Sequence, residues 1–229
     1  MGAQILVIIQ VRLNSKRLTG KALLPLGEVP MLVYLLRRLK VLPRPYKLIV
    51  ATTTNAEDDN IAFTAEKEGI EVVRGEEQDV LARYIKCIAI FPAELIVRVT
   101  ADNPLTDPEI LMNVTSQMRK KGYDYVRAMN GYPVGAGVDA FTDKLLRLLY
   151  KNTTSAYDRE HLNSYVLSHP DKFKICELHA PCALAYPDLR LTVDTSEDYE
   201  RLKKIVESYP RNYFINTEDA IECAYKRNI

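Results

Sequence analysis

The residues best suited to chemistry are four cationic side chains that lie within ten positions near the start of the chain. They follow an apolar run at residues 5–11, and they are Arg12, Lys16, Arg17 and Lys21. Arginine forms paired hydrogen bonds to phosphate oxygens, and lysine supplies a compact charge. Gly20 lets the backbone approach a phosphate closely. The spacing predicts a triphosphate site, and a solvated basic loop on the surface is the alternative.

This loop matches neither of the two common phosphate-binding motifs. Gly20-Lys21 is followed by Ala22 and lacks the upstream glycine of G-x-x-x-x-G-K-[ST]. No G-x-G-x-x-G sequence lies near it. ATP hydrolysis by a P-loop and dinucleotide binding are therefore both disfavoured.

Two carboxylates stand close to the ends of predicted strands. Asp102 follows the apolar run 95–99 and lies in a turn marked by Asn103-Pro104. Mg²⁺ takes one or two such carboxylates together with water and phosphate oxygens. The alternative for Asp102 is a turn residue that bonds its own backbone. Asp194 precedes Thr195-Ser196-Glu197-Asp198, which reads as a helix cap with an acidic first turn, but Asp194 itself lies outside that cap.

The elements that must position these groups alternate between short Ile/Val-rich runs and longer segments of helical period. We predict strands at 5–11, 48–52, 70–74 and 95–99, and helices at 31–42, 58–68, 79–91 and 107–121. This order predicts an α/β fold with a doubly wound, mostly parallel sheet. Ligands of such folds bind at the carboxyl ends of the strands.

The second half of the chain is less regular. Strands are predicted at 123–128, 138–141, 173–178 and 191–193, and helices near 143–150, 159–167, 197–208 and 217–225. We see no repeat and no linker rich in Gly, Pro or Ser. Residues 1–229 are therefore expected to form one domain.

Composition restricts the class of protein further. The formal net charge is +1, so no global field draws the chain to nucleic acid or to anionic lipid. The four cysteines form no C-x-x-C pair, which disfavours a zinc knuckle and a secreted disulfide scaffold. The first apolar run is too short for a signal peptide or a membrane span. A cytoplasmic protein is expected.

The run from Ile8 to Lys21 resembles the opening signature of the cytidylyltransferases that activate sugar acids, the CMP-Kdo and CMP-N-acetylneuraminate synthetases. It is most similar to their spore-coat polysaccharide biosynthesis relatives. The family pattern is roughly A-R-x-x-S-x-R-L-P-G-K, and Thr19 replaces its proline. The resemblance implies the Rossmann-like architecture of nucleotide-diphospho-sugar transferases. It also implies that Arg12, Arg17 and Lys21 hold the triphosphate as the catalytic cations.

The same resemblance assigns further residues. Nucleotide contacts are implied for Arg12, Asn14, Ser15, Lys21, Ala51, Thr52, Thr53, Arg74 and Arg83. Asp102 and Asp194 would bind the metal, because Thr192-Val193-Asp194-Thr195 resembles the family's V-D-T-P-E-D segment. Short segments similar to the spore-coat branch assign Asp139, Arg159 and His161 to the acceptor.

The activity that the resemblance implies is transfer of CMP from CTP to a sugar or sugar-acid acceptor, with Mg²⁺ as cofactor and pyrophosphate as product. It implies a role in surface polysaccharide or glycoconjugate biosynthesis and a homodimer. Two alternatives stay open. A glycosyltransferase of related fold usually carries D-x-D at the strand end, where this chain has Ala101-Asp102-Asn103-Pro104. A nucleotide-binding protein without turnover is the second.

Overall fold

Strand β1 (Ile5–Gln10) lies inside the sheet, and both of its faces are covered. The side chains of Ile5, Val7 and Ile9 enter one hydrophobic cluster, and those of Leu6 and Ile8 enter another on the opposite face. This two-sided burial explains why β1 reads as an uninterrupted apolar run rather than as an alternating one. The computed structural model describes residues 4–14, 18–210 and 213–226.

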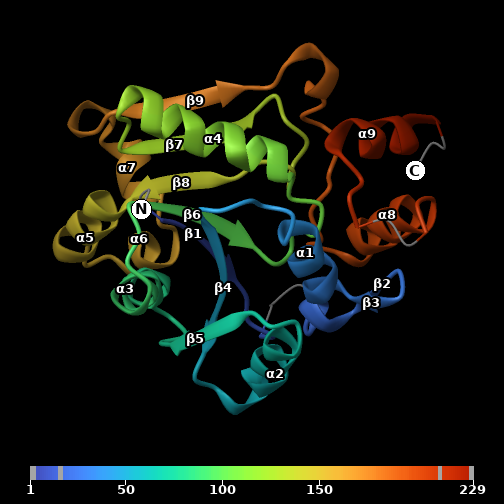
Figure 1. Cartoon of the computed structure of the whole chain (residues 1–229), viewed down its shortest axis with the longest axis horizontal. Coiled ribbons are helices and arrows are strands. Elements are labelled where there is room, and N and C mark those ends of the chain that lie inside the picture. Colours follow the sequence, from blue (N-terminus) through green and yellow to red (C-terminus); the bar gives the residue numbers. More distant parts are fainter. Residues whose placement is uncertain (1–3, 15–17, 211–212, 227–229) are drawn as a thin grey trace.

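The helices and strands follow one another along the chain as Figure 1 labels them. The strands are β1, β2 (Pro25–Leu26), β3 (Val29–Pro30), β4 (Tyr46–Thr53), β5 (Glu71–Gly75), β6 (Leu95–Thr100), β7 (Tyr125–Asn130), β8 (Asp139–Thr142) and β9 (Ile175–His179). The helices are α1 (Met31–Leu39), α2 (Asp59–Lys67), α3 (Val80–Ile90), α4 (Pro108–Lys121), α5 (Asp143–Asn152), α6 (Ala156–Glu160), α7 (Ser164–Ser168), α8 (Ser196–Glu207) and α9 (Thr217–Lys226).

Within the described residues, seven strands form one sheet in the order β5-β4-β1-β6-β8-β7-β9. Strands β5, β4, β1 and β6 are parallel, and β7 is parallel to β9. Strand β8 runs antiparallel to both of its neighbours. The chain winds outward from β1 through β4 to β5 and then returns to the other side of β1 as β6. The predicted doubly wound, mostly parallel sheet is confirmed.

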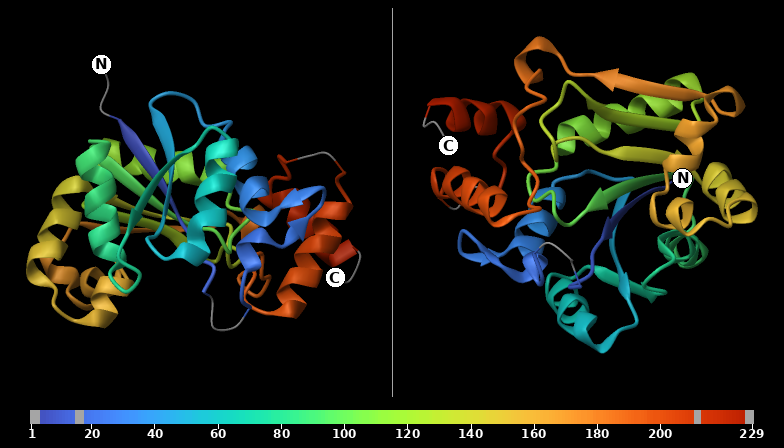
Figure 2. Two further views of the ribbon diagram at one scale, coloured as in Figure 1. Left: turned by 90° about the horizontal axis from the view of Figure 1, so that it is seen from below. Right: turned by 180° about the vertical axis from the view of Figure 1, so that it is seen from behind.

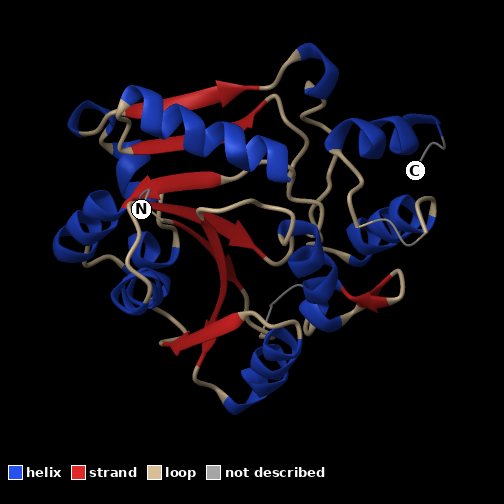
Figure 3. Cartoon of the chain, in the orientation of Figure 1, coloured by secondary structure: helices blue, strands red, loops and turns tan. Residues whose placement is uncertain are grey.

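Helices cover both faces of this sheet (Figures 2 and 3). Buried residues of α1, α2, α4, α8 and α9 share one hydrophobic cluster. Buried residues of α3, α5 and α7 share the other. Helices α8 and α9 gather beside α1 and the β2–β3 hairpin at one end of the molecule (Figure 1). In the described part of the chain, no helix is both long and apolar enough to cross a membrane.

Two of the predicted elements are wrong. Residues 191–193 do not form a strand of the sheet. The backbone N–H groups of Leu191 and Val193 donate to carbonyls of two different loops and not to one neighbouring strand. Leu191 N–H donates to Val134 O (2.7 Å) and Val193 N–H to Asp102 O (2.8 Å). The predicted helix 159–167 is two short helices, α6 and α7, because the backbone leaves helical geometry at His161 (φ −105°, ψ 84°).

Candidate functional site

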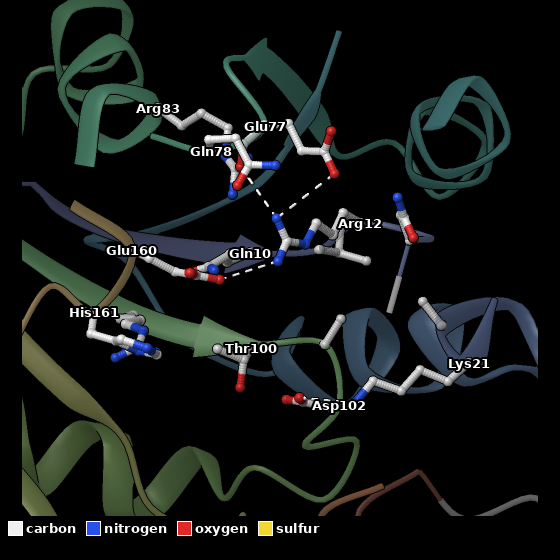
Figure 4. Close-up of a pocket in the computed structure, with 15 residues that line it drawn as sticks. Gln10, Arg12, Lys21, Glu77, Gln78, Arg83, Thr100, Asp102, Glu160 and His161 are labelled. Atoms are coloured by element: carbon white, nitrogen blue, oxygen red, sulfur yellow. Dashed lines mark hydrogen bonds and ion pairs between the residues drawn. The ribbon is translucent and has the colours of Figure 1, made fainter. Parts of the chain in front are cut away.

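A cleft of about 520 Å³ opens at the carboxyl ends of β1 and β6 (Figure 4). Gln10 and Thr100, the last residues of these two strands, are partners in the parallel register and both line the cleft. The chain order reverses between β1 and β6, which is where ligands of doubly wound folds bind. Six of the residues predicted from sequence line this cleft: Arg12, Asn14, Lys21, Arg83, Asp102 and His161.

Lys21 is held at the cleft wall by three acceptors from distant segments. Its ammonium donates to Val193 O at 2.6 Å, to Asp102 Oδ2 at 3.1 Å and to Asp194 Oδ1 at 3.4 Å. Lys21 begins a 3₁₀ turn directly after Gly20, whose φ of 73° is left-handed and favours glycine. The N–H of Gly20 donates to Leu13 O (3.0 Å), which closes the loop that follows β1.

The loops that carry Asp102 and Asp194 are joined by backbone contacts. Asp102 O accepts the N–H of Val193 (2.8 Å) and the hydroxyl of Thr192 (3.3 Å). Arg190 Nη2 donates to Asp194 Oδ2 at 3.0 Å. The helix cap expected after Asp194 is present, since Thr195 and Asp198 form a capping box at the start of α8. The two carboxylates therefore converge on one point from loops that are hydrogen-bonded to each other.

This pair of carboxylates suits a hard divalent cation. Carboxylate oxygens are the ligands that Mg²⁺ prefers, and it takes only one or two of them when phosphate oxygens and water complete its shell. Asp102 and Asp194 lie within 3.4 Å of the same ammonium nitrogen, so both can reach a cation between them. Among the described residues no group of three His, Cys, Asp or Glu side chains could hold a metal, so a closed all-protein site is not formed there.

Arg12 extends across the cleft between two glutamates (Figure 4). Its Nη2 lies 3.1 Å from Glu160 Oε1, and its Nη1 lies 3.3 Å from Glu77 O and 3.9 Å from Glu77 Oε1. Arg83 is 1% exposed, and its Nη1 donates to Glu76 O (2.7 Å) and Glu77 O (3.1 Å). Burial lowers the pKa of Arg83, and the charge of Arg12 lowers it further. The guanidinium groups of Arg12 and Arg83 thus both contact the Glu76–Glu77 loop, and the charge of Arg12 faces the carboxylates of Glu77 and Glu160.

The other predicted nucleotide contacts lie outside the lining of this cleft. Ala51, Thr52 and Thr53 are fully buried at the end of β4. Thr53 N–H and its hydroxyl both donate to the buried Asp58, which also accepts the N–H of Leu13 (2.8 Å). These residues therefore join the first loop to β4. The Arg74 guanidinium turns away to Thr53 O and Asn55 O, both at 2.8 Å. Ser15 and Arg17 lie outside the described residues.

A second cavity of about 270 Å³ adjoins the cleft. It is lined by Asp139 and His161, two of the three predicted acceptor residues. Asp139 is 3% exposed and accepts from Tyr125 Oη (2.6 Å) and Arg98 Nη1 (3.2 Å). Burial raises the pKa of Tyr125 and the Asp139 charge raises it further. Burial opposes the charge on Arg98, but Asp139, Tyr84, Tyr125 and Asp102 together outweigh burial and raise the pKa of Arg98.

Arg159, the third predicted acceptor residue, lines neither cavity. Its Nε lies 3.4 Å from Asp79 Oδ2, and its guanidinium stacks over the ring of Tyr150 at 4.5 Å. Arg159 therefore joins α6 to the N-cap residue of α3 and to α5. Its position supports α6 rather than a direct contact with a ligand in the cavities.

Sequence reasoning missed several residues of the two cavities. Gln10 and Thr100 end adjacent strands, so the rule that ligands bind at strand ends could have identified them. Glu77 and Glu160 carry no local signal, because the contact of Glu160 with Arg12 spans 148 positions of sequence. In the sequence Arg98 is an ordinary strand residue. Only the pairing of β6 with β8 in the structure shows that Asp139 lies beside it.

Comparisons with known proteins agree with this geometry. A family model described as cytidylyltransferase matches residues 6–223. The chain is 35% identical over 206 residues to the spore coat polysaccharide biosynthesis protein SpsF of Bacillus subtilis, which covers 88% of this chain and 85% of that protein. A solved cytidylyltransferase from Leptospira borgpetersenii superposes with a TM-score of 0.91 at 31% identity, over 100% of this chain and 95% of that chain.

A more distant structure shares the fold. CMP:2-keto-3-deoxy-manno-octonic acid synthetase complexed with CTP superposes with a TM-score of 0.70 at 16% identity, over 90% of this chain and 99% of that chain. The predicted family resemblance and the predicted nucleotidyltransferase architecture are both confirmed. This chain belongs to the cytidylyltransferase family.

Proposed function

We propose that this protein is a magnesium-dependent cytidylyltransferase that transfers CMP from CTP to a sugar or sugar-acid acceptor and releases pyrophosphate. The observation that supports the proposal best is the convergence of Lys21, Asp102 and Asp194 at the carboxyl ends of β1 and β6. Nucleotidyl transfer requires a positively charged side chain that faces the leaving phosphates and, beside it, carboxylates that can hold a metal ion. The CTP bound to the distant synthetase and the role of SpsF in polysaccharide biosynthesis support the substrate classes.

The chain's own residues would act mainly by position and charge. Arg12 and Lys21 donate to phosphate oxygens and offset the negative charge that develops on the leaving pyrophosphate. Arg17 is proposed for the same role. Asp102 and Asp194 would hold Mg²⁺, which when bound polarises the phosphate oxygens as a Lewis acid. The larger cleft is assigned to the nucleotide, and the adjoining cavity with Asp139 and His161 to the acceptor.

Pyrophosphate release tests this function directly. The purified chain is incubated with ATP, CTP, GTP or UTP, with Mg²⁺ and with a panel of sugars and sugar acids that includes 2-keto-3-deoxy-manno-octonic acid. We expect release with CTP, and we expect EDTA to abolish it. Slow hydrolysis of a nucleotide-sugar without release from CTP would instead favour a glycosyltransferase. Tight CTP binding that needs no Mg²⁺ and yields no pyrophosphate would favour a non-catalytic protein.

Two substitutions probe the residues that support the proposal. Lys21→Ala removes the charge that faces the leaving group, so turnover should fall on the order of a hundredfold. Asp102→Asn removes one proposed metal ligand, so the Mg²⁺ concentration for half-maximal rate should rise. Lys120→Ala, an exposed residue of α4, is the matched control and should retain full turnover. Full activity in both Lys21→Ala and Asp102→Asn would contradict the assignment.

We further propose that the protein acts in the cytoplasm as a homodimer, in the biosynthesis of a spore-coat or other surface polysaccharide. The family resemblance and the similarity to SpsF support this setting. Light scattering in solution tests the dimer, since a mass near 26.1 kDa would correspond to a monomer.

A further inference from the structure

The nucleotide cleft and the second cavity share part of their walls. Three residues line both, and they are Arg98, Thr100 and His161. If CTP occupies the larger cavity and the acceptor the smaller one, as proposed above, the attacking oxygen and the α-phosphorus must meet beside this shared wall. The inference that follows rests on that proposed function. A group that takes the proton of the acceptor hydroxyl must also lie there.

Two of the three shared residues are unsuited to accepting a proton. Arg98 carries a guanidinium, which stays protonated in proteins, and its Nη1 donates to Asp139 Oδ2 at 3.2 Å. Thr100 offers an alcohol oxygen, which already accepts the side-chain amide of Asn103 at 2.9 Å. The imidazole of His161 is the remaining group, and a neutral imidazole has a ring nitrogen that can accept a proton.

The backbone around His161 is held firmly. Its N–H donates to Tyr157 O (2.8 Å), and its carbonyl accepts the N–H (2.9 Å) and the hydroxyl (2.7 Å) of Ser164. The ring packs against that of Tyr157 with 4.5 Å between centroids. Among the described residues, neither ring nitrogen has a hydrogen-bond partner. His161 is exposed and lines both cavities, the larger of which is drawn in Figure 4, so its imidazole is accessible to a ligand in either one.

We infer that His161 is the general base of the transfer. An imidazole nitrogen accepts the proton of the acceptor O–H while that oxygen forms a bond to the α-phosphorus of CTP. The bond from the α-phosphorus to the bridging oxygen breaks, and its electron pair leaves with pyrophosphate. The proton remains on His161 until product release returns it to solvent. No oxidant or further co-reactant is required.

Charged groups lie on α6, which precedes His161, and on the elements that line the two cavities or pack against α6. Glu160 and Asp158 lie on α6 itself, and Glu160 contacts Arg12 from the loop after β1. Asp158 accepts the hydroxyl of Ser164 at 2.5 Å. Arg98 and Asp139 contribute an ion pair from β6 and β8, while Asp79 at the start of α3 faces Arg159. The pH experiment therefore compares variants that differ at position 161 alone and leave these groups in place.

The test uses the full chain with CTP, Mg²⁺ and 2-keto-3-deoxy-manno-octonic acid, or the panel acceptor that gives the fastest pyrophosphate release. His161→Asn and His161→Gln keep a polar side chain but supply no base. We expect kcat to fall at least about 100-fold, with little change in the Kd for CTP measured by calorimetry. Free imidazole should restore part of the rate. His179→Asn, at the exposed end of β9 and outside both cavities, is the matched control.

The pH profile separates a base from a structural residue. In the wild type kcat should decline as the solution is made acidic, because protonated imidazole cannot accept the hydroxyl proton. Both variants should lack that decline. A raised KM for the acceptor with kcat within about threefold of wild type, or an unchanged acidic decline in the variants, would overturn the role as base. If the wild type binds CTP but releases no pyrophosphate with any acceptor, the proposed function fails, and this inference fails with it.

Discussion

Asp198 connects a helix cap to one of the two carboxylates that face Lys21. Its oxygens accept from the backbone N–H groups of Asp194 (3.1 Å) and Thr195 (3.2 Å) and from Nε and Nη2 of the Arg190 guanidinium. Burial by itself would raise the pKa of Asp198. The hydrogen bonds from Arg190 and from the backbone outweigh burial and hold that pKa well below its usual range. Because Arg190 also bonds Asp194, Asp198 fixes the position of the proposed metal ligand.

Asp198→Asn should therefore lower the free energy of unfolding by about 1 to 3 kcal/mol at pH 7. A carboxyl group with a depressed folded-state pKa contributes stability above its unfolded pKa, and that contribution is lost as the pH falls through the folded one. The difference from wild type should thus shrink as the pH falls below about 4. Urea unfolding at several pH values measures it. A loss that stays constant down to pH 3 would contradict this account. Asp59→Asn, an exposed carboxylate, should cost about 1 kcal/mol or less.

The segment between β7 and β8 positions Asp139 in the second cavity through glycines. A Cβ built at Gly137 would lie 1.6 Å from Ala128 O on β7. Gly135 has a φ of 99°, and its Cβ would lie 2.8 Å from the carbonyl carbon of Leu191. The close approach at Gly137 is needed for Ala128 N–H to donate to Val138 O (3.0 Å), immediately before β8 begins at Asp139.

We expect Gly137→Ala to destabilise the protein by more than about 2 kcal/mol, because the backbone of β7 cannot move without breaking its pairing with β8. Gly122→Ala is the matched control. Gly122 ends α4 with a φ of 64° but has no atom within 4 Å of its Cβ position, so its cost should be about 1 kcal/mol. Thermal and urea unfolding compare the two variants. Equal losses would contradict this account, because the contact with Ala128 O would then add no cost at Gly137.

The order of elements was predictable where a local pattern determines it. The two-sided burial of β1 and the aspartate cap with proline at the start of α4 are both visible in the sequence. Lys21, Asp102 and Asp194 could be proposed together only through family resemblance, and the structure does bring them together. The contacts of Arg12 with Glu160 and of Arg98 with Asp139 depend on tertiary packing. The prediction of a strand at 191–193 is wrong because these side chains are buried in the core while their backbone pairs with no strand of the sheet.

At the scale of the whole molecule, Arg38 on α1 joins distant parts of the chain. Its guanidinium is 1% exposed and donates to Thr106 O (2.8 Å) and Tyr213 O (3.1 Å). It lies 4.0 Å from Asp107 Oδ2, which accepts the N–H (3.0 Å) and the hydroxyl (2.6 Å) of Thr217 at the start of α9. We propose that residues 1–229 fold as one domain, and this network supports the proposal because it ties the last helix to α1 and α4.

Arg38→Ala leaves two carbonyls and a carboxylate buried with fewer donors, so the free energy of unfolding should fall by about 3 to 5 kcal/mol. Arg37→Ala is a stringent control, since the neighbouring arginine is partly exposed and bonds Glu68 and Tyr213 Oη at the surface. Its cost should be about 1 kcal/mol.

The chain has no tryptophan, so tyrosine fluorescence and circular dichroism follow urea unfolding. If α9 detached first in the wild type, tyrosine fluorescence and circular dichroism would report separate unfolding transitions, and the one-domain proposal would fail. Coincident transitions, together with an equal loss of unfolding free energy in Arg38→Ala and Arg37→Ala, would instead contradict the role of Arg38 as the connection between the two ends of the chain.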